Sequence, residues 1–470
     1  MGKALIARKQ EVETLEKIVN SSKSEFVAVY GRRRVGKTFL IRQFFNNRFD
    51  FYLSGIANCG IKEQLRAFNK ALAKYGYDKK ASNWFDAFDY LAELLSGEPE
   101  EKKIVFIDEM PWLDTPKSNF IQALEHFWNS WASAQDNIKF IVCGSSTSWI
   151  TSKLINGKGG LHNRLTNRIE LLPFTLDDCK EYFKARKFPF QARQIAQCYM
   201  IMGGIPFYLD YLDPQIPFSK NIDQLFFRAN GLMRTEFDNL YSALFKNSDD
   251  YITIVEALAT KRKGLTRKEI TVATRKTTSG GLSKILANLE MCGFIRSYYA
   301  YGKVNRDKLY QLVDSYSLFY FNFIKNRQAT DEDYWTLSIN TSEVDSWFGY
   351  AFEILCLNHI QKIKNVLGIS GIRTSVYSWN YQPDSGNGAQ IDLILDRADG
   401  FMNICEIKFS RDKYVITKAY NEKMSQNINA FMAQTKTSKA PIFTMITSNG
   451  VKQNANYDIV QKEICLDDIL

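Results

Sequence analysis

Residues 26–41 read Phe-Val-Ala-Val-Tyr-Gly-Arg-Arg-Arg-Val-Gly-Lys-Thr-Phe-Leu-Ile, and this stretch decides how the first part of the chain folds. Residues 26–30 are an apolar run typical of a buried strand, and the apolar spacing from Phe39 onward predicts a helix. Between them lies the spacing G-x4-G-K-T, which predicts a phosphate-binding loop when a strand precedes it and a helix follows it. The alternative is a chance glycine-rich turn, which leaves the flanking strand and helix unexplained.

The loop has the residue types that a nucleotide needs. Gly31 and Gly36 let backbone N–H groups turn towards phosphate oxygens, and the helix N-terminus adds partial positive charge. We expect Lys37 to reach the β- and γ-phosphates of ATP and Thr38 to bind Mg²⁺. The other positions expected to contact the nucleotide are the remaining loop residues and the first apolar residue of the helix: Arg32, Arg33, Arg34, Val35 and Phe39.

A second apolar run ends in two acids. Residues 104–107 are apolar, and Asp108 and Glu109 follow them. At the carboxyl edge of a parallel sheet, Asp108 would hold Mg²⁺ through water. Glu109 would orient or activate the attacking water, which makes it a candidate catalytic residue. The alternative is that these acids only cap a helix.

A third apolar run, residues 138–143, ends in Gly144-Ser145-Ser146-Thr147. The pattern is typical of the next core strand, and it would place a hydroxyl, such as that of Ser145, near the γ-phosphate. A plain Gly-Ser loop is the alternative for any one of these hydroxyls.

Length and composition limit what the rest of the chain can be. With 470 residues, 45% hydrophobic and 24% charged, the chain is expected to form about three globular domains and is not disordered, collagen-like or coiled-coil throughout. Its 61 Lys and Arg outnumber 51 acids, a net charge of +10 that permits a polyanion partner or simply a basic surface. No signal peptide or run of 18 apolar residues is found, so we expect a cytoplasmic protein without a membrane span.

The cysteines give no sign of a disulfide framework or a zinc site. The eight residues are scattered without a CxxC pair, and several, such as Cys143 and Cys405, lie in apolar runs. We expect them to be reduced core residues.

Residues 250–300 predict a winged helix-turn-helix. A helical run from Tyr251, a basic turn, a helix capped by Thr266, a break at 279–281, a helix over 282–292 and a β-rich tail follow in order. Residues 261–276 hold seven basic side chains against one acid, Glu269. The basic residues are Lys261, Arg262, Lys263, Arg267, Lys268, Arg275 and Lys276. They would contact DNA phosphates, or the segment would be a spacer with a solvated basic face.

The last third of the chain combines acids with apolar strands. An aromatic stretch over 300–340 is expected to be core, and the polar residues 326–346 are expected to form a linker. Glu353 lies on a predicted helix, and Asp392 is embedded in a predicted strand that turns back through 396–400. The return strand carries Glu406 and Lys408, two residues apart and therefore on one face.

Such a set of residues suits phosphodiester cleavage. Asp392 and Glu406, on paired strands, would bind Mg²⁺ or Mn²⁺, and Lys408 would orient or deprotonate a bound water or neutralise developing charge. The alternative, ordinary charges on a solvated face, fits poorly because the flanking residues are apolar. Asp392, Glu406 and Lys408 are therefore candidate catalytic residues.

Residues 1 to about 215 resemble the AAA-like family often called archaeal ATPases, related to the STAND class of P-loop NTPases. The matching motifs are Arg8-x-x-Glu11-x-x-x-Leu15, the loop 31–38, Ile107-Asp108-Glu109, Cys143-Gly-Ser-Ser146, the segment 159–169 before Leu172-Pro-Phe174, and Gly203-Gly-Ile-Pro206. The resemblance implies a parallel sheet with a helical lid, and it places Pro206 in a lid motif beside the nucleotide. It also implies an arginine finger at Arg164 or Arg168, often supplied across a subunit boundary; a surface salt bridge is the alternative for either arginine.

The C-terminal residues resemble the PD-(D/E)xK nuclease superfamily, and more closely the nuclease-like domain that follows ATPases of this type. Glu353 matches its helical Glu, Asp392 its strand Asp, Glu406-Ile-Lys408 its E-x-K, and the run 414–418 the stretch after it. The resemblance implies that Glu353 binds the metal together with Asp392 and Glu406. The implied fold class is α/β: an AAA-like P-loop NTPase, a winged helix-turn-helix and an α/β restriction-endonuclease-like domain. The expected ranges are 1–170 for the ATPase core, 171–245 for a helical lid, 246–325 for the winged helix, 326–346 for the linker and 347–470 for the nuclease-like domain.

Two functions remain open from the sequence. The first is an ATPase whose nucleotide state positions a Mg²⁺-dependent nuclease on DNA. The second is a nucleotide-dependent switch or scaffold that binds a protein partner and does not cut. Both predict ATP binding, and assembly with further copies of the chain fits either.

Overall fold

The computed structural model describes residues 5–97, 101–157, 159–245, 247–275, 280–303, 308–327, 332–383 and 388–470. The chain divides into two units. The first unit comprises Met1–Pro173 with Ile205–Phe207, and the second unit comprises Phe174–Gly204 with Tyr208–Leu470. Lys276, one of the predicted basic residues of the winged helix, lies outside the described residues.

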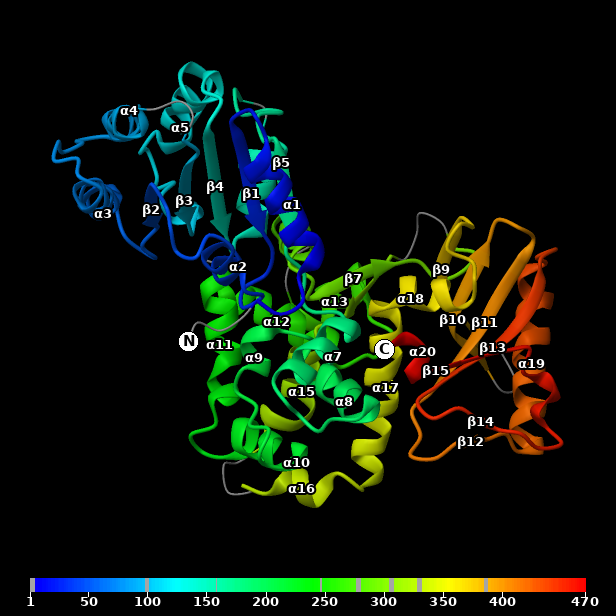
Figure 1. The fold of residues 1–470 in the computed structure, drawn as a ribbon. Helices are drawn as coiled ribbons and strands as arrows, with labels where there is room; N and C mark the ends of the chain where they lie inside the picture. The colour runs from blue at the N-terminus through cyan, green and yellow to red at the C-terminus, as the bar shows by residue number, and fades with distance from the viewer. Residues whose placement is uncertain are drawn as a thin grey trace. The chain divides into compact units, whose positions relative to one another are not determined.

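The first unit is built on a parallel 5-stranded sheet in the order β2-β3-β4-β1-β5 (Figure 1). Phe26, Val27, Ala28 and Val29 are all buried although alternate residues of a strand point to opposite faces, so both faces of the sheet are covered. The strands are β1 (Glu25–Tyr30), β2 (Phe51–Ser54), β3 (Lys103–Asp108), β4 (Ile138–Gly144) and β5 (Asn167–Glu170).

Amphipathic helices supply the core against this sheet. In α3, Leu65, Phe68 and Leu72 recur at helical spacing and join one hydrophobic cluster with residues of α4, α5 and the strands. The longer helices of the unit are α1 (Lys9–Asn20), α2 (Lys37–Phe44), α3 (Ile61–Lys74), α4 (Trp84–Leu95) and α5 (Phe120–Ser130). The short ones are η1 (Met110–Trp112), η2 (Ala132–Ala134), α6 (Thr147–Trp149) and η3 (Ile150–Ile155).

Strand register brings the three predicted motifs to one edge of the sheet. Tyr30, the last residue of β1, pairs with Gly144, the last residue of β4. Asp108, the last residue of β3, pairs with Ser54 at the end of β2. Because all these strands are parallel, the segments that follow Tyr30, Asp108 and Gly144 leave the sheet at its carboxyl edge.

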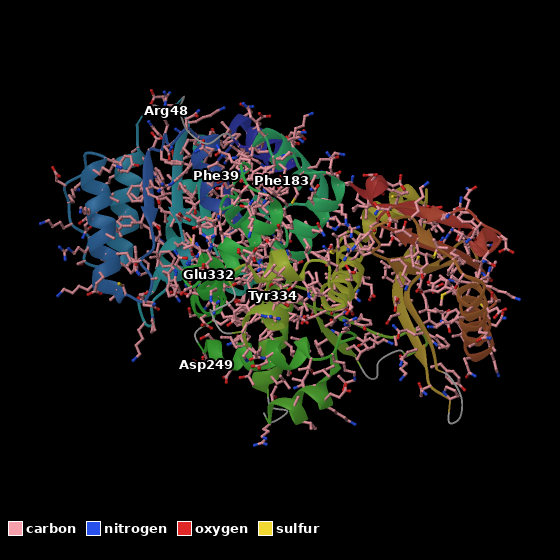
Figure 2. The ribbon with its side chains drawn as sticks, turned by 90° about the horizontal axis from the view of Figure 1, so that it is seen from below. Phe39, Arg48, Phe183, Asp249, Glu332 and Tyr334 are labelled. Carbon is pink, nitrogen blue, oxygen red and sulfur yellow. The ribbon has the colours of Figure 1, made fainter. Side chains whose placement is uncertain are left out.

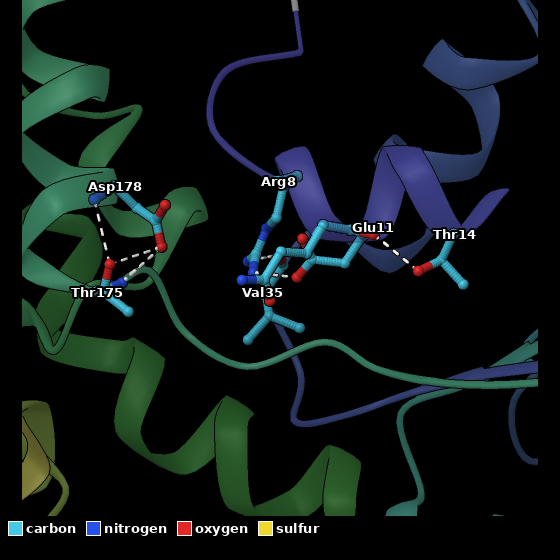
Figure 3. A network of polar contacts seen from close by, with 7 residues as sticks. Arg8, Glu11, Thr14, Val35, Thr175 and Asp178 are labelled. Carbon is cyan, nitrogen blue, oxygen red and sulfur yellow. Dashed lines mark hydrogen bonds and ion pairs between the residues drawn. The ribbon is translucent and has the colours of Figure 1, made fainter. Parts of the chain in front are cut away.

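The second unit begins with helices. They are α7 (Leu176–Ala185), α8 (Ala192–Met202), α10 (Phe218–Ile222), η4 (Asp223–Phe227) and α11 (Leu232–Leu244); α9 (Pro206–Leu209) has residues in both units. Thr175 and Asp178 form a capping box at the start of α7 (Figure 3). Each end of a helix leaves backbone groups without intrahelical partners, so this box fixes where α7 begins.

The 248–312 segment contains helices and a small antiparallel sheet in the order β6-β8-β7. Its elements follow the order expected from the sequence, with a basic turn before β6 and a hairpin after the last helix. They are α12 (Ser248–Ala259), β6 (Leu265–Thr266), α13 (Arg267–Thr274), α14 (Gly280–Met291), β7 (Ile295–Tyr298) and β8 (Leu309–Leu312). The predicted cap at Thr266 is present, because its hydroxyl accepts from the Glu269 N–H and the Glu269 carboxylate accepts from the Thr266 N–H.

The stretch expected to be a linker, 326–346, is instead packed structure from Asp333 onward. Trp335 is fully buried, and its backbone N–H donates to Asp223 at 2.7 Å. Tyr334 (Figure 2) stacks beneath the guanidinium of Arg327, 3.4 Å from its ring centre. Burial of these rings outweighs the polar composition that suggested a linker. The helices here are α15 (Ser315–Phe319), η5 (Tyr320–Ile324) and α16 (Tyr334–Ser338), and the next helix starts before residue 347, at Ser342.

The C-terminal part of the second unit is a mixed 5-stranded sheet in the order β15-β13-β11-β10-β9, with α17 and α19 packed against it (Figure 1). The predicted hairpin is present, with β10 and β11 antiparallel and joined by a short turn. The strands are β9 (Thr374–Tyr381), β10 (Ala389–Arg397), β11 (Phe401–Lys408), β13 (Ala440–Thr447) and β15 (Lys462–Cys465), with a ribbon of β12 (Tyr414–Val415) and β14 (Val451–Lys452). The helices are α17 (Ser342–Asn358), α18 (Ile360–Val366), α19 (Lys418–Thr435), η6 (Tyr457–Ile459) and α20 (Leu466–Ile469).

Two further predictions concern the whole chain. All eight cysteines are free thiols, six of them buried, in agreement with the expectation of reduced core residues. In the part of the chain that the structure describes, no helix combines the length and apolarity needed to cross a membrane.

Candidate active sites

The loop after β1 has the backbone that its glycines predict. Gly31 has a φ of 141°, and a Cβ placed on it would lie 2.2 Å from the carbonyl oxygen of Leu171. Only glycine fits there, because both the backbone angle and the space exclude a side chain. The loop ends at Gly36, which has a φ of 92° and caps α2. Lys37 and Thr38 are therefore the first two residues of this helix.

Lys37 lies across the loop. Its Nζ donates to the carbonyl oxygens of Gly31 and Arg32, both at 2.9 Å, and its side chain is buried. Two backbone carbonyls therefore hold the ammonium at the loop that was predicted to bind phosphate.

Thr38 and Asp108, the two residues expected to hold Mg²⁺, are in contact. The Thr38 hydroxyl donates to the Asp108 carboxylate, with oxygens 3.0 and 3.1 Å apart. Burial raises the pKa of the Asp108 carboxyl above its usual range, and the hydrogen bond from Thr38 opposes this shift. A hydroxyl and a carboxylate in contact at a phosphate loop are the oxygen donors that Mg²⁺ uses in such sites, and a cation there would favour the ionised Asp108.

Glu109 is held from the neighbouring strand. Its carboxylate accepts a hydrogen bond from the Ser145 hydroxyl at 3.0 Å and lies 3.4 Å from the Ser145 backbone nitrogen. Its backbone is in the left-handed region, with a φ of 47°. The sequence predicted a Ser145 hydroxyl near phosphate, and the structure places that hydroxyl on Glu109.

Two residues outside the loop contact its backbone, and the sequence interpretation gave neither a role in the site. Arg8 donates from Nη2 to the Val35 carbonyl at 3.1 Å (Figure 3). The backbone N–H of Phe207 donates to the Arg34 carbonyl at 3.4 Å, and the Arg34 guanidinium lies 3.8 Å from the Phe207 ring centre. The sequence could have indicated both residues. Arg8 is the first residue of the motif Arg8-x-x-Glu11-x-x-x-Leu15, and Phe207 directly follows Pro206, a predicted nucleotide contact.

The remaining residues predicted to contact the nucleotide lie at or near the loop, but neither candidate for the arginine finger does. Arg32 is buried, Arg33 is half-buried, and Phe39 on α2 is 37% exposed (Figure 2). Arg164 is exposed in the turn before β5, and Arg168 is exposed on β5. Within the described residues, neither arginine side chain donates a hydrogen bond to residues 31–38.

The C-terminal acids come from three elements of the second unit. Glu353 lies on α17, Asp392 on β10 and Glu406 on β11. Leu393 and Cys405 pair with each other in the hairpin. Asp392 and Glu406 are the next residues of the two strands on the side away from the turn. Gln390 donates from Nε2 to the Asp392 carboxylate at 2.5 Å.

The charges at these acids influence one another. Burial, together with the carboxylates of Asp392 and Glu406, raises the pKa of Glu353 to about 8. Burial lowers the pKa of Lys408, but the Glu406 carboxylate 2.6 Å from its Nζ more than compensates, so the pKa is raised overall. The ion pair with Glu406 therefore favours the charged form of Lys408.

The predicted three-carboxylate metal site is not assembled in this structure. Among the described residues, no group of three or more His, Cys, Asp or Glu side chains is placed to hold a metal ion. Glu406 has other partners, because its Oε1 is bonded to Lys408 and accepts the Tyr420 hydroxyl at 2.8 Å. The three carboxylates supply oxygen ligands and repel one another, so they would still suit a divalent cation, provided that Glu406 leaves Lys408 and Tyr420. Tyr420 was not predicted as a site residue.

Comparison with known proteins gives the family of the N-terminal part of the chain. Residues 5–212 match the model of a family described as an ATPase domain predominantly from Archaea. The chain contains an ATPase domain of this family. The ATPase domain includes the loop, Asp108, Glu109 and Ser145. An uncharacterized ATP-binding protein of Methanocaldococcus jannaschii is 49% identical over 43 residues, which are 9% of this chain and 73% of that protein.

Other relatives are more distant. An uncharacterized protein of the same organism is 24% identical over 397 residues, 83% of each chain. Among solved structures, a Walker-type ATPase of Pyrococcus abyssi is 20% identical, with a TM-score of 0.46 over 67% of this chain and 96% of that one. The ORC2 protein of Aeropyrum pernix, solved in ADPNP–ADP complexes, is 12% identical, with a TM-score of 0.42 over 72% and 96% of the two chains.

Proposed function

We propose that the ATPase domain hydrolyses ATP with Glu109 as the residue that orients and activates the attacking water. The observation that carries this proposal is the contact of Glu109 with Ser145, which holds a carboxylate at the edge where Thr38 and Asp108 also meet. A carboxylate positioned by a neighbouring strand can accept a proton from water that is aligned with the γ-phosphate.

The other residues of the domain would bind and neutralise the phosphates. Lys37 would transfer its ammonium from the two loop carbonyls to phosphate oxygens, and the loop N–H groups would bind the same oxygens. Thr38 and Asp108 would hold Mg²⁺, which supplies charge neutralisation at the phosphates. Pro206, next to Phe207, would contact the nucleotide through the lid motif. Arg164 would act as a finger on the phosphates bound by a neighbouring copy, for which its exposure is suitable.

Removal of the Lys37 ammonium tests the nucleotide site. Lys37→Ala should weaken ATP binding roughly 30-fold or more, because the loop loses a charge-assisted contact with phosphate. The matched control is Lys17→Ala, which removes an exposed lysine on α1 of the same unit. Isothermal titration with ATP and Mg²⁺ provides the measurement, and an unchanged Kd for Lys37→Ala would contradict the assignment.

We also propose that the second unit contains a winged helix-turn-helix over 248–312 and a phosphodiester-cleaving site at Glu353, Asp392, Glu406 and Lys408. The proposal is supported by the cavity that Glu353 and Asp392 line together and by the ion pair between Lys408 and Glu406. Lys408 would neutralise charge that develops on the cleaved phosphate, and DNA is the proposed substrate. Mg²⁺ or Mn²⁺ would supply further charge neutralisation when it is bound.

DNA cleavage by the full chain tests this second proposal against the non-cutting switch. Linear DNA, ATP and Mg²⁺ or Mn²⁺ should give cleavage products with the wild-type chain and at least a hundredfold fewer with Asp392→Ala. Asp399→Ala is the control, because Asp399 lies in the turn after β10, where its carboxylate pairs with Arg397. Cleavage that survives Asp392→Ala would contradict the site, and absence of cleavage under all conditions would favour a switch that binds a protein partner.

A further inference from the structure

A cavity of about 280 Å³ in the second unit lies between the 248–312 segment and the C-terminal sheet. Its lining contains basic residues from the 248–312 segment and acids from α17 and from the C-terminal sheet. The basic residues are Arg262, Lys263 and Arg296, and the acids are Glu353 and Asp392. The acids proposed to act on a phosphodiester therefore share one cavity with part of the basic turn of the predicted winged helix.

The basic turn is held in place by its backbone. The carbonyl of Arg262 accepts from Gln311 Nε2 at 2.6 Å and from the Tyr350 hydroxyl at 3.0 Å, and the carbonyl of Lys263 accepts from the Tyr298 hydroxyl at 2.7 Å. Gly264 follows with a φ of 81°, and a Cβ there would lie 2.3 Å from the Tyr310 carbonyl oxygen. These contacts fix the direction in which the turn presents its side chains, whether or not a ligand is bound.

The helix with Glu353 is bonded to the same turn. Ser346, Tyr350 and Glu353 recur at helical spacing and therefore share one face of α17. On that face, Ser346 accepts from Arg262 Nη2 at 3.1 Å and Tyr350 donates to the Arg262 carbonyl. Glu353 thus lies one turn beyond two direct contacts between α17 and the basic turn.

The opposite charges are held apart across the cavity. Lys263 and Arg296 are each half-buried, and Arg296 donates from Nε to Gln311 Oε1 at 2.7 Å and lies over the Tyr298 ring. In the described chain, neither cation has a carboxylate oxygen within 4.0 Å of its side-chain nitrogens. If the basic residues served only to neutralise the acids, we would expect them to form ion pairs with these acids. A half-buried cation without a partner raises the free energy of the folded chain. Cations fixed at a distance from carboxylates leave room for an anionic group between them.

The size of the cavity limits what can enter. About 280 Å³ is at the lower end of the range for small-molecule sites. A cavity of this volume is of the size of a small ligand and cannot enclose both strands of a duplex. The cavity therefore suits one unpaired nucleotide at a time.

We propose that Lys263, with Arg262 and Arg296, binds the backbone phosphate of a single nucleic-acid strand and places it against Glu353 and Asp392. The proposal rests on the phosphodiester function proposed above, and it adds the substrate class and the phosphate-binding residues. In this arrangement the winged helix contributes one wall of the site, and Lys263 is a positioning residue.

Equilibrium binding of a single-stranded oligonucleotide tests the proposal without any need for cleavage. Full-length protein is titrated into a fluorescein-labelled DNA strand in Ca²⁺ at several salt concentrations, and an RNA strand of the same sequence is measured in parallel. Lys263→Ala should weaken binding about tenfold and reduce the slope of log K against log salt by about one. Lys263→Arg should restore most of the affinity, because the charge returns on an intact backbone.

The matched control is Lys184→Ala on α7, an exposed lysine of the same unit that does not line the cavity; it should change affinity less than twofold. Equal losses for both variants, or tighter binding by Lys263→Ala, would overturn the proposal. Duplex binding as tight as single-strand binding would overturn the substrate class. Binding that depends on Lys263 without cleavage would keep this proposal and remove the nuclease, whereas cleavage that is indifferent to Lys263 would do the reverse.

Discussion

The Glu109 carboxylate is positioned by Ser145. Glu109 adopts a left-handed backbone conformation that costs about 1–3 kcal/mol, and such conformations persist where surrounding contacts determine them. The Ser145 hydroxyl is one of those contacts. At the scale of the residue, catalysis is therefore expected to depend on Ser145 although Ser145 makes no proposed contact with the reacting water.

Ser145→Ala should lower kcat for ATP hydrolysis about five- to tenfold with little change in KM. The reason is the loss of one hydrogen bond, worth roughly 1 kcal/mol, from the residue that orients water. Steady-state ATPase kinetics beside Ser146→Ala provide the measurement and its control. Equal kcat for the two variants would mean that Ser145 has no part in positioning Glu109.

Gly31→Ala should destabilise the first unit and abolish ATP binding. A methyl group at this position would overlap the Leu171 carbonyl, and its backbone angle is one that residues with side chains avoid. Gly76→Ala is the matched control, because Gly76 also has a positive φ but faces open space. Thermal unfolding should show a clearly larger fall in Tm for Gly31→Ala, and equal falls would rule out the predicted overlap.

At the scale of the element, a buried histidine joins helices that are far apart in sequence. His359, after α17, accepts from the Leu176 backbone N–H at its Nε2 at 3.1 Å, and its Nδ1 bonds the Leu355 carbonyl at 2.9 Å. It therefore satisfies an unpaired N–H at the start of α7. Both bonds require the neutral ring, with the proton on Nδ1. Burial lowers the pKa of His359 below its usual 6.5.

This arrangement predicts that stability falls with acidity. Because the unfolded chain takes up a proton more readily, the contribution of His359 is complete above pH 6.5 and is lost as the pH falls from 6.5 towards the lower folded pKa. His359→Gln keeps an acceptor but does not titrate. Chemical unfolding between pH 7.5 and 5 should show a smaller loss of stability for this variant, and parallel curves for the two proteins would contradict the prediction.

Elements whose signal is local could be predicted from the sequence, and those fixed by distant contacts could not. The strand, loop and helix around residues 26–41 follow from apolar spacing and glycine positions, as does the β10–β11 hairpin. Helix α16 was not predicted from the sequence. It depends on the burial of Trp335 and on the hydrogen bond from its backbone to Asp223, which is 112 residues away in the sequence. The polar composition of that stretch gave no sign of this contact.

At the scale of the whole molecule, residues of both sites could be named in advance, but their side-chain partners could not. Lys37 lies across the predicted loop, and Thr38 contacts Asp108. The contact of Ser145 with Glu109 and the bond of Tyr420 to Glu406 depend on how packed elements orient two side chains, which spacing alone does not specify. The net charge of +10 is partly explained by three arginines in the phosphate loop and by Arg262 and Lys263 in the cavity.

The most direct measurement of the central claim, ATP hydrolysis driven by Glu109, is single-turnover hydrolysis by Glu109→Gln. The variant keeps the size of the side chain but removes the base, so ATP affinity should stay within about twofold of wild type. The rate of hydrolysis should fall at least a hundredfold, in line with the usual contribution of a general base. Hydrolysis by Glu109→Gln at the wild-type rate would contradict the account.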